Sequence, residues 1–163
     1  MNSQEKRVEK FKTSDIPLGA LVGMLCKTHM AYLNSKLKNV DLNGGQFPYL
    51  KIISKHENIS QDEIAFHLQV DKGTAARTLK KLEDKQLITR NIDPKNRRKY
   101  QLKITPKGEQ ATKQITKYDK EWENIIYKEL DLFSKEEIQT MLKEIAIETL
   151  YLTQPIKHEC ELE

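Results

Sequence analysis

DKGTAARTLKKL, residues 71–82, decides the fold, because it predicts a helix with two different faces. At 3.6 residues per turn, Ala75, Leu79 and Leu82 share one stripe, the spacing that a helix uses to bury one side. The opposite face holds small and basic residues and no large apolar side chain: Gly73, Thr74, Arg77, Lys80 and Lys81. Such a face suits the DNA major groove, because small residues permit close approach while Arg and Thr reach base edges and phosphates. A solvated, charged helix face has the same pattern, so the flanking segments must decide between the two interpretations.

The segment before this helix predicts a second, shorter helix. Residues 60–63, SQDE, form a capping box, in which Ser60 and Glu63 satisfy each other's backbone amides. Apolar residues at helical spacing follow, and Asp71 is well placed to cap the next helix. Two short helices joined by a few residues, the second of them basic, form a helix-turn-helix, here residues 60–83.

The segment after the helix predicts a β-hairpin over residues 87–104. Residues 87–92 and 99–104 alternate in part between apolar and polar, as strands do. Residues 93–98, DPKNRR, combine turn formers with a cluster of cations at the tip. A helix-turn-helix followed by a basic hairpin is a winged helix, and this succession is more specific than any of its parts.

These motifs resemble the MarR-type transcriptional regulators. The resemblance covers roughly Leu18 to Leu152, and the segments that carry it are Asp41–Phe47, Ile59–Ala65, Asp71–Thr74, Leu79–Glu83, Asp93–Arg98 and Ile104–Gly108. It implies a dimeric DNA-binding protein whose recognition helix enters the major groove, while a wing arginine, here Arg97, reaches the adjacent minor groove. The chain departs from the family pattern at two positions, with Asn96 where the family often has Asp and Gln86 where it often has Gly.

The predicted DNA contacts lie on the recognition helix, at its approach and on the wing. They are Ser60, Lys72, Gly73, Thr74, Arg77, Thr78, Lys81, Lys95, Asn96, Arg97 and Arg98.

Charge along the chain supports a polyanionic partner for the winged segment. The net charge of the 163 residues is only +4. Residues 71–103 hold eleven Lys or Arg against four Asp or Glu, whereas residues 104–163 hold eight against thirteen. The basic patch therefore belongs to the winged segment, which favours binding to nucleic acid there.

The winged segment, residues 60–104, is called the reader below. Long amphipathic segments flank it and predict an association module. One helix is expected over residues 16–40 and a second over residues 46–56, with two more over residues 105–152 that begin at Thr105 and at Ser134. The apolar stripes of the first helix and of the last two exceed what one winged domain can absorb, so we expect a two-fold dimer formed through residues 16–40 and 105–152, although these helices could instead fold back onto their own domain. The fold class is thus mainly α with a small β-hairpin wing, in a domain of residues 16–152 between an N-terminal arm (1–15) and a tail (153–163).

Other chemistry has little support in the sequence. The four histidines show no ligand spacing, and the two cysteines, Cys26 and Cys160, form no Cys-x-x-Cys motif, so neither a metal, a cofactor nor a disulfide framework is expected. Relatives that sense peroxides have their cysteine nearer Leu21, so Cys26 is expected to be a buried, inert thiol. No catalytic constellation stands out. The charged N-terminus and the lack of a long apolar run predict a cytoplasmic protein without a membrane partner.

Two function classes remain. The first is a homodimeric DNA-binding regulator, most simply a repressor at a near-palindromic operator, relieved by a small aromatic ligand in a crevice lined by His29, Tyr32 and Tyr49. The second is a winged-helix dimer that acts mainly through protein contacts and binds nucleic acid only non-specifically. Changes at Thr74 or Arg77 discriminate between them, because only the first class loses sequence discrimination.

Overall fold

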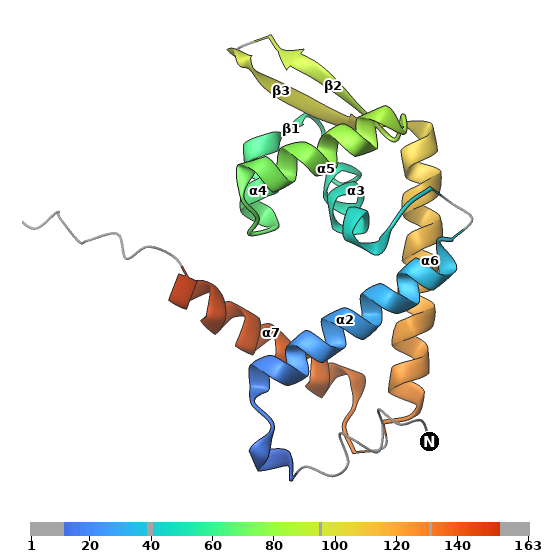
Figure 1. Ribbon diagram of the computed structural model, residues 1–163, viewed down its shortest axis with the longest axis vertical. Helices are drawn as coiled ribbons and strands as arrows, with labels where there is room; N and C mark the ends of the chain where they lie inside the picture. Colours follow the sequence, from blue (N-terminus) through green and yellow to red (C-terminus); the bar gives the residue numbers. More distant parts are fainter. Residues whose placement is uncertain (1–11, 39–40, 95, 131, 154–163) are drawn as a thin grey trace, which may run out of the picture. The chain divides into compact units, whose positions relative to one another are not determined.

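The computed structural model describes residues 12–38, 41–94, 96–130 and 132–153. They form two compact units, one up to Trp122 and one from Glu123, with the boundary inside a helix. The elements follow in the order η1 (Thr13–Asp15), α2 (Leu18–Lys36), η2 (Gly44–Gln46), α3 (Phe47–Ile53), β1 (Ile59–Ser60), α4 (Gln61–His67), α5 (Lys72–Asp84), β2 (Ile88–Asp93), β3 (Asn96–Ile104), α6 (Pro106–Lys128) and α7 (Lys135–Thr153) (Figure 1). The predicted fold class, mainly helical with a small β wing, is confirmed.

The helix-turn-helix has the two caps that its sequence predicts. Ser60 accepts a hydrogen bond from the amide of Glu63 at 3.2 Å, and the Glu63 carboxylate accepts from the amide of Ser60 at 2.8 Å. Asp71 accepts from the amide of Thr74 at 2.8 Å. Each cap satisfies a donor that a helix start leaves without an intrahelical partner, so α4 and α5 begin at fixed residues.

The wing belongs to a three-stranded antiparallel sheet in the order β1-β3-β2. β2 and β3 form the predicted hairpin, in register from Ile88 opposite Ile104 to Ile92 opposite Tyr100. The short strand β1 was not predicted. It pairs Ile59 with Leu102, immediately before the capping box that starts α4. This pairing ties the wing to the helix-turn-helix through backbone hydrogen bonds.

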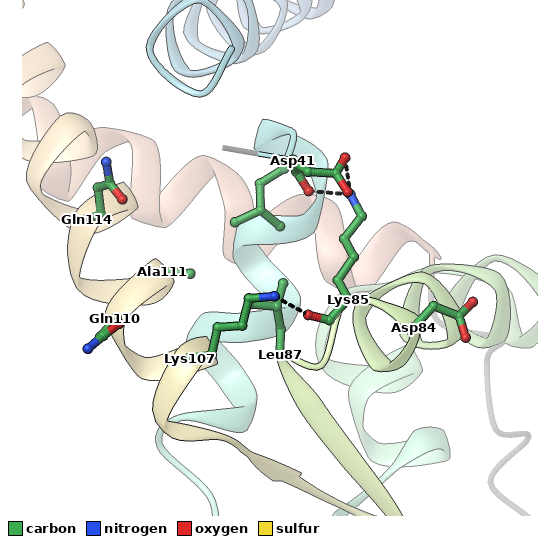
Figure 2. Close-up of a pocket in the computed structure, with 9 residues that line it drawn as sticks. Asp41, Asp84, Lys85, Leu87, Lys107, Gln110, Ala111 and Gln114 are labelled. Atoms are coloured by element: carbon green, nitrogen blue, oxygen red, sulfur yellow. Dashed lines mark hydrogen bonds and ion pairs between the residues drawn. The ribbon is translucent and has the colours of Figure 1, made fainter. Parts of the chain in front are cut away.

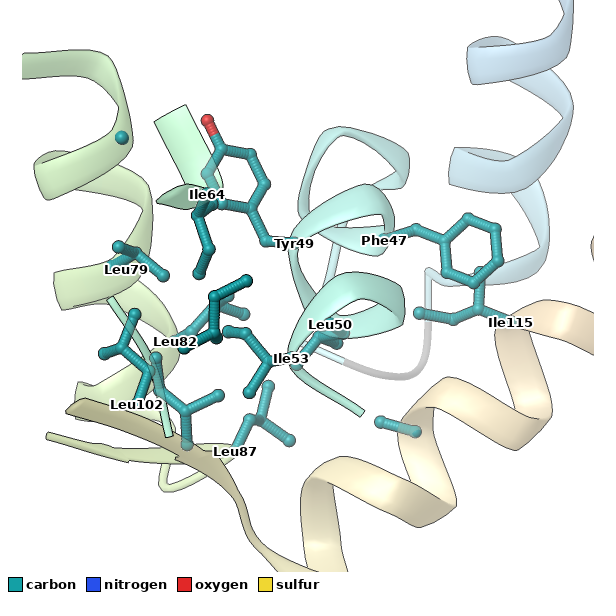
Figure 3. Packing of buried hydrophobic residues seen from close by; sticks show 14 of the residues in the cluster. Phe47, Tyr49, Leu50, Ile53, Ile64, Leu79, Leu82, Leu87, Leu102 and Ile115 are labelled. Carbon is teal, nitrogen blue, oxygen red and sulfur yellow. The ribbon is translucent and has the colours of Figure 1, made fainter. Parts of the chain in front are cut away.

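The hydrophobic core of the first unit lies between α3, α4, α5 and the base of the sheet (Figure 3). Ala75, Leu79 and Leu82 are fully buried, as the stripe on α5 predicts. The other completely buried large side chains come from the remaining elements of the first unit, from α2 to α6. They are Leu33, Leu37, Leu50, Ile53, Ile64, Ile88, Leu102 and Ile115.

The first two predicted helices are shorter than the sequence suggested. The helix expected over residues 16–40 runs from Leu18 to Lys36, because Pro17 adopts an extended conformation as its N-cap and Leu37 turns into the core after its last turn. The helix expected over residues 46–56 runs from Phe47 to Ile53 and ends in a tight turn before Asn58, whose φ of 60° is left-handed. Val40, which the sequence places in the first helix, lies outside the described residues.

The start of α6 is held against the end of the reader. Thr105 caps α6 by accepting from the amide of Gly108 at 3.0 Å, and its own amide donates to the carbonyl of Leu87, also at 3.0 Å. A Cβ on Gly108 would lie 2.1 Å from that same carbonyl oxygen. Only glycine permits this approach, so α6 and the Leu87 backbone are in direct contact.

The second unit starts in the last turns of α6 and includes α7. Ser134 and Glu137 form the predicted capping box of α7, with the amide of Ser134 donating to the Glu137 carboxylate at 2.8 Å and the amide of Glu137 donating to the Ser134 hydroxyl at 3.2 Å. The Ser134 hydroxyl, which donates to the Glu137 carboxylate at 2.7 Å, and then the Ser134 amide hold the pKa of Glu137 below its ordinary value of 4.5.

The turn after α5 contains a residue with unfavourable backbone geometry. Gln86 has a φ of 59°, and the amide of Leu87 closes the helix end on the carbonyl of Leu82 at 2.9 Å. Glycine usually occupies this left-handed position, because a side chain there costs about 1 kcal/mol.

Gln86→Gly should therefore stabilise the protein. Removing the side chain relieves the left-handed strain, and the greater freedom of glycine in the unfolded chain offsets part of the gain, so we expect the free energy of unfolding to rise by about 0.5–1 kcal/mol. Urea titration measures it. Gln110→Gly is the matched control, because Gln110 lies in a regular right-handed part of α6, where the same change should cost about 1 kcal/mol. Loss of stability at both positions would contradict the strain argument.

Candidate nucleic-acid interface

The outer face of α5 is basic and free of large apolar groups. Gly73, Arg77 and Lys81 are exposed on it, and Thr74 and Thr78 are partly exposed beside them. The Arg77 guanidinium donates to the Thr74 hydroxyl at 3.1 Å, so two predicted base-reading groups lie together. Lys80 is less available, because it is bound to Asp84 at 2.9 Å and to Glu83 at 3.3 Å.

The N-terminal cap of α5 is an ionised carboxylate. The hydroxyl and the amide of Thr74 hold the pKa of Asp71 below its ordinary value of 3.8, and the charge of Arg77 adds to the effect. The N-cap of α5 therefore interacts with Thr74 and Arg77, two residues of the predicted reading face.

Two predicted DNA contacts already have partners within the chain. The Ser60 hydroxyl is part of the capping box, where it donates to Glu63 at 2.6 Å. The Lys72 ammonium lies 3.1 Å from Asp62 on α4, although its side chain remains 77% exposed. Such an exposed pair is weak, so a phosphate can compete for Lys72 at little cost.

The predicted wing contacts lie around the turn between β2 and β3. Asn96, Arg97 and Arg98 belong to the first residues of β3, next to Pro94 in the turn. Lys95 is outside the described residues. The topology thus brings the backbone of residues 96–98 to the end of the hairpin that is farthest from the core.

Arg90 was not predicted as a functional residue, yet it contacts three elements at the base of the wing. Its guanidinium lies 3.9 Å from Glu83 on α5, 3.5 Å from Gln61 on α4, and 4.6 Å from the ring centre of Tyr100 on β3. The signal in the sequence was a cation between Ile88 and Ile92 on the apolar face of a strand.

The three predicted ligand residues lie in different surroundings. His29 on α2 shares a hydrogen bond of 2.9 Å with Asp119 and packs on Trp122, with ring centres 4.5 Å apart. Tyr32 is partly buried under the ammonium of Lys36, whereas Tyr49 belongs to the core. Cys26 was expected to be buried, but the structure shows it exposed, because the N-terminal half of α2 is not covered by the rest of the first unit.

A cleft of about 350 Å³ lies between the end of α5, the start of α6 and the segment before η2, and none of the three predicted ligand residues lines it (Figure 2). The Lys85 ammonium bonds to the carbonyl and the carboxylate of Asp41, and the Lys107 ammonium donates to the Lys85 carbonyl at 2.8 Å. These bonds fasten the three segments around the cleft. The lining holds two carboxylates, Asp41 and Asp84, against two lysines, so the cleft has no surplus of positive charge for an anionic ligand.

Within the described ranges, no group of three or more His, Cys, Asp or Glu side chains is arranged to hold a metal ion. The helices of those ranges are also too short or too polar to cross a membrane.

Comparison with known proteins identifies the family of the chain. The MarR family model matches residues 42–100, from the segment before η2 into the wing. The HTH-type transcriptional regulator BilQ of Clostridioides difficile (strain CD3) is 31% identical over 130 residues, covering 80% of this chain and 86% of the relative. The chain belongs to the MarR family.

Solved structures of MarR-family proteins agree with this assignment. The crystal structure of a MarR protein is 32% identical in sequence, covers 87% of this chain and 97% of its own, and superposes with a TM-score of 0.79. A MarR transcriptional regulator from Methanosarcina mazei Go1 is 29% identical, covers 83% and 97%, and superposes with a TM-score of 0.77. The protein is therefore a DNA-binding transcriptional regulator and not an enzyme.

The cap of α5 predicts a pH-dependent contribution to stability. Because the folded state lowers the pKa of Asp71, its contribution is complete above the ordinary value of 3.8 and is lost as the pH falls through the lowered pKa. Asp71→Ala should therefore lower the Tm at pH 7, and the gap to wild type should narrow at about pH 3.

Asp71→Asn serves as the control, because a neutral amide caps the helix at every pH. Its Tm should stay above that of Asp71→Ala by the same amount at both pH values. If the difference in Tm between wild type and Asp71→Ala is the same at pH 7 and at about pH 3, the charge of the Asp71 carboxylate contributes nothing to stability.

Proposed function

We propose that this MarR-family regulator is a homodimeric repressor that binds a near-palindromic operator. In this proposal α5 of each protomer reads the major groove, and Arg97 of each wing enters the neighbouring minor groove. The observation that carries it is the rotation of α5. Its apolar stripe is buried, so Gly73, Thr74 and Arg77 face outward. A dimer bound across a promoter excludes other proteins from that DNA, and repression follows from this.

The dimer is supported by apolar side chains that neither unit buries. In the first unit the exposed ones on α2 include Leu18, Val22 and Leu25. In the second unit they are Ile125, Leu130, Leu132, Phe133, Met141, Leu142, Ile147, Leu150 and Leu152. Apolar surface of this extent marks an interface in a soluble protein. We propose that α2, α6 and α7 form it, with the two recognition helices about 34–36 Å apart, one turn of DNA.

The proposal includes relief of repression by a ligand. Small aromatic molecules remain the candidates, with the partly buried His29 and Tyr32 as contacts and Tyr49 accessible only if the core opens. Such a ligand would weaken DNA binding only by favouring a dimer whose two α5 helices have the wrong spacing.

A charge placed in the proposed interface should separate the protomers. Ile125→Glu puts a carboxylate at an apolar position that is 53% exposed in the single chain. Sedimentation velocity should show a wild-type dimer at micromolar concentration and a monomeric variant. Phe66→Glu is the control, because Phe66 on α4 is 68% exposed but outside the proposed interface, and it should leave the dimer intact. A wild-type monomer would refute the assembly.

Arg77→Ala tests the reading face. A base-edge contact should give about 1–3 kcal/mol of discrimination, so the variant should bind a selected duplex and a scrambled one with more similar affinities. Lys95→Ala and Arg97→Ala should instead flatten the salt dependence by roughly one unit for each phosphate that the wing no longer neutralises. Lys113→Ala, an exposed cation on α6, should change neither quantity.

If Arg77→Ala keeps the wild-type ratio of affinities for the selected and the scrambled duplex, the result supports the alternative, a winged helix that acts mainly through protein contacts. The wild-type titration repeated with small aromatic acids tests the effector, which we would abandon if DNA affinity and Tm stay constant.

A further inference from the structure

The wing leaves the hydrophobic core at Arg90. Ile88, Arg90 and Ile92 share one face of β2, where they lie opposite Ile104, Leu102 and Tyr100 of β3 in turn. At the base of this face Ile88 and Leu102 are buried, while at its outer end Ile92 is 59% exposed and Tyr100 is 43% exposed. Arg90 therefore lies where this face changes from buried to exposed.

The guanidinium of Arg90 lies between three elements. It stacks on the Tyr100 ring within the wing, and it faces Gln61 at the start of α4 and Glu83 near the end of α5. Its side chain is only 16% exposed, and its buried Nε finds no hydrogen-bond partner among the described residues. A surface lysine could supply the charge, but only a planar guanidinium can stack on a ring and face two acceptors at its edge.

The separate contacts are weak. The distances of 3.5 Å to Gln61 and 3.9 Å to Glu83 are long for hydrogen bonds, and Glu83 also binds Lys80 at 3.3 Å. The contacts of Arg90 matter because they join three elements: α4, α5 and the wing. A side chain held in this way restricts the angle between the hairpin and α5 while contributing little to global stability.

We propose that Arg90 is a positioning residue for DNA recognition, which sets the angle of the wing against α5 without contacting DNA. The inference rests on the proposed entry of the wing into the minor groove. An entropic cost follows if Arg90 is removed, because the hairpin must then be ordered when it binds. Base reading by α5 does not depend on that angle and stays intact.

The experiment compares two lengths of DNA. The wild-type chain selects a duplex from a random-sequence pool, and a second duplex is trimmed at both ends so that it lacks the outer base pairs protected by the wings. The wild type should bind the long duplex about tenfold more tightly than the trimmed one, since trimming removes the DNA that the wings touch. Arg90→Met should lose most of this advantage and bind the trimmed duplex within about twofold of wild type.

Three further variants make the result specific. Arg97→Ala removes the proposed minor-groove contact itself and should lose the same advantage. Lys103→Met, an exposed cation on the same hairpin, should keep it. Tyr100→Leu removes only the ring below the guanidinium and provides a milder test if Arg90→Met folds poorly, with far-UV circular dichroism and Tm as checks of folding.

Each outcome is decisive. If Arg97→Ala loses the advantage but Arg90→Met and Tyr100→Leu keep it, the positioning role is refuted while the proposed function stands. If Arg90→Met weakens both duplexes equally, Arg90 supports the whole reader rather than the wing, and the inference is wrong. If the wild type shows no advantage for the long duplex, the wing does not contact DNA, and the proposed function fails together with the inference.

Discussion

Burial of Ala75, Leu79 and Leu82 fixes the rotation of α5 about its axis, and the rest of the reader depends on that rotation. Each buried leucine contributes on the order of 1.5–3 kcal/mol, whereas an exposed ion pair such as Lys72–Asp62 contributes about 1 kcal/mol at most. The core therefore decides which face of the helix points outward. The surface pairs adjust side chains on a face that is already chosen.

Local rules explain why so much of the reader could be predicted from the sequence. The caps at Ser60, Asp71, Thr105 and Ser134 involve partners three residues away, so a short window of sequence contains the whole interaction. The stripe on α5 and the alternation in the hairpin are equally local. The MarR resemblance then joined these pieces in the correct order, as the family assignment confirms.

What the sequence could not show depends on distant parts of the chain. β1 has only two residues, and its existence depends on β3 lying beside it. The end of α2 is set by Leu37 entering the core, and the site around Arg90 needs α4, α5 and β3 together. Cys26 was misjudged for a similar reason, since an apolar stripe shows that a helix has a face to bury but not which part of it is covered within one chain. The predicted DNA contacts in the wing stay predictions.

Among the described residues, three other than glycine hold left-handed backbone conformations: Asn58, Gln69 and Gln86. All three lie in turns next to helices rather than on the outer face of α5, and the two glutamines carry strain there because, unlike asparagine, glutamine rarely adopts this conformation. Substitutions in these turns can therefore raise the free energy of unfolding without changing the outer face of α5. A new operator preference usually requires substitutions that destabilise the fold, and relaxing these turns first would let the recognition helix tolerate more of them.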